Sequence, residues 1–285
     1  MQRNRGLIHA IGLAGLVAAG GVAHAAVVSA DVGLNPTFEQ TGPTTLMATG
    51  GFFSGRAFVS SSSDYTGGTL SYGGPGSPQT LGFSPTDVGW EYGSPQDSSF
   101  SDLQALYPTG PYTFNLTGGT DGPTSVSITY DGDAYSNTPE LTAASFDALQ
   151  SLNAADSIAV DFNAMAPSPN ATDTFVFFSV FDSSGATVTS GSFLPSDTTS
   201  AFIGANTLMP GQTYTFEVLF SDRISGFDDV AGVPTTQFYD TRTDASFTTA
   251  GAVPEPSTWA MLLMGFLGIG VAVRGRAAAV ARRTA

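Results

Sequence analysis

Short runs in which apolar and polar residues alternate recur along most of this 285-residue chain, and turn-forming Gly, Ser, Asp and Pro residues separate them. Strict alternation over four to eight residues is typical of β-strands that bury one face. The clearest alternating runs lie at 112–116, 125–130, 156–163 and 214–220, and a last strand is expected at 237–249. The run 174–181 is apolar on both faces and predicts the central strand of its unit. The pattern predicts an all-β body of one or two β-sandwich units.

The remaining stretches of the body are patterned less clearly. Residues 26–72 contain two short strand candidates, at 51–53 and 56–59. Residues 73–95 are rich in Gly and Pro, which predicts an irregular surface loop. Residues 98–107 carry apolar side chains at helical spacing and predict one short helix.

A turn-rich segment divides the body. The sequence from Asp131 to Asn137 contains Asp, Gly, Ser and Asn but no large aliphatic residue. Such composition marks a loop between periodic segments. We therefore expect an N-terminal β-rich region at 26–130 and a second β-sandwich at 138–250.

The N-terminus has the three parts of a secretory signal peptide. Arg3 and Arg5 form a basic start, residues 6–22 are apolar, and Ala23 and Ala25 frame an Ala-x-Ala cleavage site. We expect a signal peptide at 1–25 with cleavage after Ala25. The alternative is a retained membrane helix.

The C-terminal tail has a second apolar stretch. Pro254 and Pro256 bracket Glu255, so a helix can begin only after them. The uncharged run 259–273 would give roughly 22 Å of helix, which is short against a hydrocarbon core of about 30 Å. The cluster Arg274, Arg276, Arg282 and Arg283 follows and belongs in the cytoplasm by the positive-inside rule. An ordinary C-terminal membrane anchor is one interpretation.

The tail also resembles a known sorting signal. The residues that carry the resemblance are Val253, Pro254, Glu255, Pro256, Ser257 and Trp259, followed by the apolar run and the Arg cluster. Together, at 253–283, they resemble the PEP-CTERM signal of exported bacterial proteins. The resemblance implies recognition by an exosortase, a membrane transpeptidase, and cutting near Pro254–Pro256. The protein would then be anchored only transiently in the inner membrane before it reaches the cell envelope or the exterior.

A second resemblance concerns the body. The spacing Leu208-x-Pro210-Gly-x-x-Tyr214 is similar to the tyrosine corner of fibronectin type III-like sandwiches. It implies a hydrogen bond from the Tyr hydroxyl to the backbone a few residues upstream, and a sandwich over 139–250. The usual core Trp is absent, and Phe162 stands as its candidate substitute.

Charge and composition exclude several functions. The body has three basic residues, Arg56, Arg223 and Arg242, and all but one of the chain's 24 acidic residues. Such a surface repels nucleic acid and anionic lipid. The two histidines, His9 and His24, lie in the signal peptide, and the chain has no Cys and no Lys. These counts exclude Ser-His-Asp triads, Cys nucleophiles and Lys Schiff bases from the exported body.

Carboxylate chemistry is what the composition leaves open. Glu91 lies between Trp90 and Tyr92, and a carboxyl group among aromatic rings is a candidate sugar site. The competing interpretation is a loop Glu beside packed aromatic residues. Asp131 and Asp133 are weak candidates for calcium ligands, because they do not fit the twelve-residue calcium loop. No other cofactor is expected.

Two functions follow from these observations. The first is an exported, non-catalytic interaction module of the cell envelope or extracellular matrix, delivered by its sorting signal. The alternative is a carbohydrate-binding or carbohydrate-cleaving protein that acts on exopolysaccharide. Ice binding would need Thr at a fixed period, and no such ladder is present.

Overall fold

The computed structural model describes residues 27–118, 122–132, 134–251 and 264. Most of them lie in β-strands that form sandwich-like sheets, so the all-β prediction is confirmed. The predicted helices within 1–25 and 253–283 lie outside the described residues. In the part of the chain that is described, no helix is long and apolar enough to cross a membrane.

One large sheet organises the body. It has eight strands in the order β11-β10-β13-β14-β1-β2-β6-β5. Their bounds are β1 Val27–Gly42, β2 Thr45–Val59, β5 Gly82–Ser84, β6 Gly89–Gly93, β10 Asp173–Asp182, β11 Thr187–Leu194, β13 Thr213–Asp228 and β14 Val233–Thr248. Only β1 and β14 pair in parallel; the other neighbours are antiparallel.

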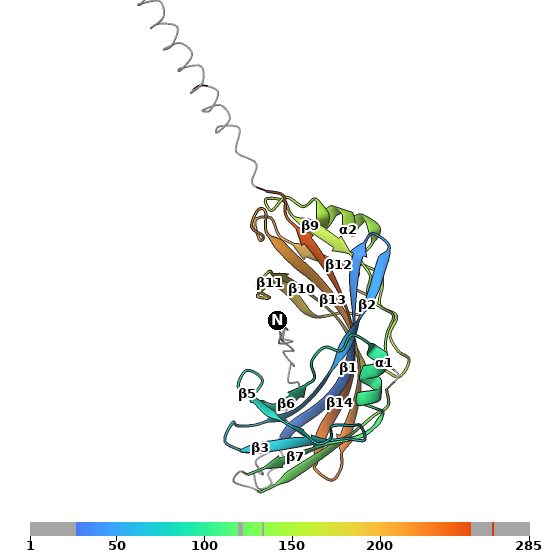
Figure 1. Ribbon diagram of the computed structural model, residues 1–285, viewed down its shortest axis with the longest axis vertical. Helices are drawn as coiled ribbons and strands as arrows, with labels where there is room; N and C mark the ends of the chain where they lie inside the picture. The colour runs from blue at the N-terminus through green and yellow to red at the C-terminus, as the bar shows by residue number, and fades with distance from the viewer. Residues whose placement is uncertain (1–26, 119–121, 133, 252–263, 265–285) are drawn as a thin grey trace, which may run out of the picture.

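Two smaller sheets and two helices accompany the large sheet. The four-stranded sheet has the order β4-β3-β7-β8, and the two-stranded sheet pairs β12 with β9. The bounds are β3 Gly67–Ser71, β4 Gln79–Thr80, β7 Gly110–Thr117, β8 Thr124–Tyr130, β9 Ile158–Asp161, β12 Ser200–Ile203, α1 Phe100–Leu106 and α2 Ala143–Gln150. Figure 1 shows the large sheet curved, with the smaller sheets and both helices on its outer side.

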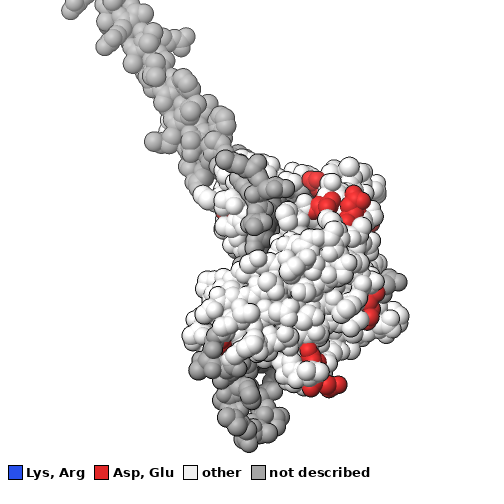
Figure 2. Space-filling model, turned by 60° about the horizontal axis from the view of Figure 1, so that its bottom comes forward, with Lys and Arg blue, Asp and Glu red and all other residues white. Residues whose placement is uncertain are grey.

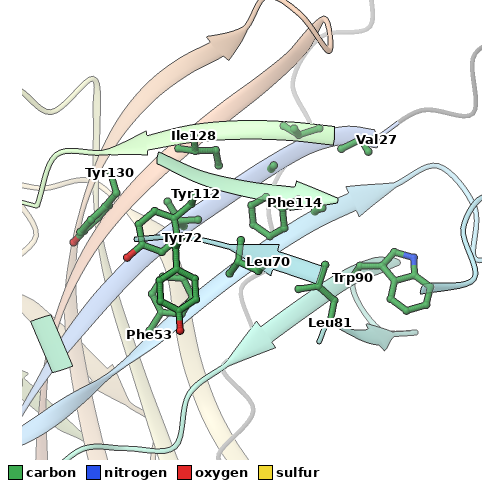
Figure 3. Packing of buried hydrophobic residues seen from close by; sticks show 14 of the residues in the cluster. Val27, Phe53, Leu70, Tyr72, Leu81, Trp90, Tyr112, Phe114, Ile128 and Tyr130 are labelled. Atoms are coloured by element: carbon green, nitrogen blue, oxygen red, sulfur yellow. The ribbon is translucent and has the colours of Figure 1, made fainter. Parts of the chain in front are cut away.

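The first hydrophobic core lies between the large sheet and the four-stranded sheet. Val32 and Leu34 of β1 and Phe53 of β2 point into it, because alternate residues of paired strands share a face. Aromatic rings fill much of the space (Figure 3). The rings of Phe53 and Tyr107 stack with centroids 4.4 Å apart, and those of Tyr72 and Tyr112 with centroids 5.4 Å apart.

The second hydrophobic core lies farther along the same face of the large sheet. Alternate residues of β10 and β13 supply one side of it, including Val176, Phe216 and Val218. Phe146 and Leu149 of α2 belong to the same core, as do Val160 and Ile203 of the two-stranded sheet. The long strands β13 and β14 extend from one core to the other, so one face of a single sheet supports both.

The large sheet runs through the predicted boundary between the two units. Strand β1, from the first unit, hydrogen-bonds along β14, from the second. The segment after β8 is attached to this sheet: the Tyr135 hydroxyl donates to the Leu34 carbonyl, and the Gln40 side chain exchanges two hydrogen bonds with the backbone of Leu141. The division at 130–138 stays a prediction; the two stretches share a sheet.

Several local predictions are confirmed and others are wrong. The short helix forms as α1, with Ser99 as its N-cap, and the 112–130 hairpin forms as β7 and β8. The 73–95 stretch is not an irregular loop, because it contains β4, β5 and β6, and β6 pairs with β2. Helix α2, which has two turns and is capped by Thr142, was not predicted, and β1 and β2 were predicted only as fragments.

The predicted tyrosine corner is present. The Tyr214 hydroxyl accepts a hydrogen bond of 2.8 Å from the backbone N–H of Met209. A similar contact occurs in the other half of the body, where the Tyr112 hydroxyl donates to the Pro108 carbonyl at 2.8 Å. In both halves, a Tyr near the start of a strand hydrogen-bonds to the loop that precedes the strand.

We expect Tyr214→Phe to lower the free energy of unfolding by about 1–2 kcal/mol, because the Met209 N–H loses its acceptor in a partly buried place. Thr213→Val is the matched control, since it removes only an exposed hydroxyl contact with Thr248. Urea unfolding of the purified protein measures both. An equal loss in the two variants would contradict a specific role for the Tyr214 hydroxyl.

Candidate functional site

Thr249 and Ala250, two of the last described residues before the C-terminal tail, are held in place by hydrogen bonds. The N–H of Ala250 donates to the Leu152 carbonyl at 2.8 Å, and the Ala250 carbonyl accepts from the N–H of Gly211 at 3.1 Å. Thr249 is held as well, because its N–H donates to the Gln212 carbonyl and its hydroxyl donates to the Met209 carbonyl. The backbone is therefore anchored on two sides up to residue 250.

The tyrosine corner supports this anchor. The loop that holds Thr249 and Ala250 includes Met209, whose N–H is bound by the Tyr214 hydroxyl. The side chain of Tyr214 is itself buried in the second core. Thr249 is thus connected to the second core through Met209 and the buried ring of Tyr214.

The tail beyond this point matches a family model. The model, described as the PEP-CTERM protein-sorting motif, covers residues 252–277. The chain carries a PEP-CTERM sorting motif. The match includes the predicted motif residues from Val253 to Trp259, together with Arg274 and Arg276; Arg282 and Arg283 follow it. All of these residues, and the signal-peptide residues Ala23 and Ala25, lie outside the described part of the chain.

Comparisons of the whole chain add little to the PEP-CTERM match. No curated protein matches. Among solved structures, the chicken CNTN1 FN1-FN3 domains match with a TM-score of 0.27 and 10% identity, over 79% of this chain and 69% of that chain. The BSP domain of a biofilm associated protein matches with a TM-score of 0.21 and 15% identity, over 78% of this chain and 30% of that chain. These values support no conclusion about the activity of the body.

The proposed sugar-site residues do not share one surface. Trp90, which is 9% exposed, and Tyr92 lie on the face of β6 that packs into the first core. Trp90 contacts Phe83 there, and the Tyr92 hydroxyl hydrogen-bonds to the Tyr107 hydroxyl at 2.9 Å. Glu91 lies between them in the strand and points to the opposite face. The structure does not assemble the predicted group of aromatic rings around a carboxylate.

Glu91 instead faces a buried ion pair. It lies opposite Arg56 of β2, and Arg56 forms a bidentate pair with Asp31 of β1, at 3.0 and 2.7 Å. Burial raises the pKa of Glu91; the nearby Asp87 charge raises it further, and the Arg56 charge opposes both. Burial works against the charge of Arg56, but Asp31 outweighs it, and the pKa of Arg56 is raised.

All three basic residues of the body lie on this face of the large sheet, opposite the two cores. Each stacks on an aromatic ring: Arg56 on Phe58 and Phe238, Arg223 on Phe175 and Phe193, and Arg242 on Phe52. Arg242 also pairs with Glu217 at 3.3 Å. On the side of the molecule that Figure 2 shows, acidic side chains are visible and no Lys or Arg is. The three cations of the body thus contact side chains of the large sheet, and acidic side chains are the charged groups visible on the side shown in Figure 2.

A sequence signal for this arrangement exists. Phe52, Arg56 and Phe58 are separated by even numbers of residues, so period-two alternation alone places them on one side of a strand. This spacing was overlooked, because only two short fragments of 26–72 were predicted as strands. The cross-strand partners of Arg56 could not be foreseen, since they depend on which strands pair.

The calcium prediction is not tested by the structure. Asp131 exchanges hydrogen bonds with the Gln237 side chain: its N–H donates to the Gln237 carbonyl at 2.9 Å, and its carboxylate accepts at 3.3 Å. Asp133 lies outside the described residues. Among the residues that are described, no group of three or more His, Cys, Asp or Glu side chains could hold a metal ion.

A buried carboxylate lies between the two cores. Asp222 of β13 is 0% exposed and is paired across the sheet with Tyr239 of the first core. Neither of its carboxylate oxygens has a hydrogen-bond partner of normal geometry within the described residues. Burial raises its pKa from the ordinary 3.8 to about 6, and the backbone N–H groups of Ser168 and Ser136 and the Ser136 hydroxyl partly oppose the shift.

This raised pKa predicts a stability change with pH. The folded protein holds the Asp222 proton more tightly than the unfolded chain, so the stabilisation is complete below about pH 4 and is lost as the pH rises through about 6. Between pH 4 and pH 8, Asp222→Asn should therefore gain stability relative to the parent by about 3 kcal/mol, at about 1.4 kcal/mol per pKa unit.

Urea unfolding at several pH values measures this difference. Asp229→Asn serves as the control, because Asp229 is exposed in the turn between β13 and β14. The assignment fails if the Asp222→Asn and Asp229→Asn curves run parallel to the parent curve over the whole pH range.

Proposed function

We propose that this protein is a bacterial envelope or matrix protein, exported and processed by an exosortase, whose β body acts outside the cytoplasm as a non-catalytic interaction module. The PEP-CTERM motif at 252–277 carries this proposal. It supports export, transient anchoring by the C-terminus and processing by a membrane transpeptidase. The place of the body in the envelope or matrix is inferred from that route.

Two features of the body support a role in interaction. Its composition without His, Cys or Lys excludes most nucleophilic and acid–base chemistry. Its acidic side chains suit a solvated surface outside the cell and disfavour contact with nucleic acid. The carbohydrate alternative depended on Trp90, Glu91 and Tyr92 sharing one surface. Because Trp90 and Tyr92 pack in the core and Glu91 lies on the opposite face, that alternative has less support.

Replacing Pro254, Glu255 and Pro256 by alanine tests the sorting route. In a bacterial host that contains an exosortase, the parent should be converted to a shorter form that lacks the tail. The triple variant should accumulate in the membrane fraction as the longer form. Pulse-chase labelling followed by electrophoresis measures the conversion.

The body offers a matched control. Residues Pro167 and Pro169 form another Pro-x-Pro sequence in an exposed loop, and changing both to alanine should leave the conversion as in the parent. Normal conversion of the triple variant would refute exosortase processing.

A further inference from the structure

Ala250, the last residue held by these hydrogen bonds, is close in sequence to Pro254–Pro256, where the proposed sorting route requires a cut. Ala250 is fixed on two sides by hydrogen bonds to Leu152 and Gly211. Pro254 follows only four residues later. Four residues of chain span at most about 14 Å in any conformation. The limit rises to about 22 Å for Pro256, six residues after Ala250, so an enzyme that acts at Pro254–Pro256 must work within about 22 Å of the fixed backbone unless the fold opens.

Three segments surround the point of departure, and we call them together the exit surface. They are residues 148–154, 204–213 and 245–251. Hydrogen bonds join them: Ala250 to Leu152, Asn206 to Ala154, and Thr249 to both Met209 and Gln212. The Gln150 side chain also donates to the Ser246 carbonyl at 2.9 Å. The exit surface is therefore a continuous part of the fold.

The three segments themselves are uncharged. None of them contains an Asp, Glu, Lys or Arg, and the nearest carboxylates along the chain, those of Asp147, Asp156 and Asp244, lie at their edges. Met209 stands out on it, with 68% of its surface exposed. An uncharged patch with an exposed apolar side chain has the composition of the buried centre of a protein interface.

We infer that the exit surface docks against the processing transpeptidase while the tail is cut. This inference rests on the proposed function, since it names the surface that the same enzyme meets. A tether of at most about 22 Å is shorter than the width of a typical protein domain, so the enzyme and the exit surface must approach each other closely. The absence of charge removes the desolvation cost that carboxylates would bring to such a contact.

A charge placed on the exit surface tests the inference. Met209→Glu keeps the backbone hydrogen bonds of the corner and adds one carboxylate next to the point of departure. Conversion to the short form should become about tenfold slower, because a charge would be brought into the interface without a partner. The matched control is Val230→Glu, since Val230 is 97% exposed in the turn at the other end of the β13–β14 hairpin.

A longer linker before the tail distinguishes loss of docking from misfolding as the cause of slower conversion. Ten Gly and Ser residues inserted between Gly251 and Ala252 add roughly 17 Å of average reach, so that cutting no longer needs contact with the body. With this insert, the Met209→Glu chain and the otherwise unchanged chain should be converted at the same rate. A deficit that persists with the insert, or an equal slowing by Val230→Glu, would overturn the inference.

The partner is identified by crosslinking in the uncut chain. A photoreactive amino acid at position 209, in the variant with alanines at 254–256, should form an adduct with an epitope-tagged exosortase, and the same group at position 230 should not. Adducts with lipid alone would overturn the inference in favour of a membrane contact. If the alanine variant were still processed, the proposed function would fail; if only Met209→Glu were without effect, docking alone would fail.

Discussion

The parallel pairing of β1 with β14 is the constraint on which the rest of the structure depends. It joins Ala30 to Thr235, so about 200 residues of chain lie between the two partners and their pairing closes a long loop. The chain has no cysteine to hold this closure, and the sheet relies on apolar burial. One face of the long strands supports both cores, so the two halves of the body share one large sheet.

The opposite face shows how an acidic protein uses very few cations. Arg56 and Arg242 are almost fully buried, and each combines a carboxylate partner with an aromatic ring. A buried charge is tolerated when it is paired and hydrogen-bonded, and Arg suits this role because its planar group can do both and also stack. Asp222 forms no ion pair within the described residues, and burial therefore raises its pKa. Asp31, in contrast, is paired with Arg56.

The tyrosine corner connects the fold to the sorting tail. Tyr214 binds Met209, Met209 and its loop bind Thr249, and the matched sorting motif begins at residue 252. A residue that a fibronectin-like resemblance explains as a fold element therefore also helps to hold the backbone that directly precedes the PEP-CTERM motif.

Local chemistry was sufficient for part of this description. The alternation of Tyr112, Phe114 and Leu116 predicted β7, that of Tyr214, Phe216 and Val218 predicted the buried face of β13, and the sorting motif was recognisable from its own residues. Each of these signals lies within a few neighbouring positions. They need no information about distant strands.

Which strands pair, and which of their faces are covered, depends on contacts between distant parts of the chain. Alternation shows that a strand has two faces, but it does not say which neighbour lies beside it. The Gly-rich sequence of β6 predicted a loop, but this segment pairs with β2 as a strand. The pairing also places Trp90 in the first core. Local sequence patterns were enough to predict the strands with strong alternation, the acidic character of the body and its sorting tail. The shared sheet, the buried ion pairs and the fixed point of departure arise from contacts between residues far apart in the chain.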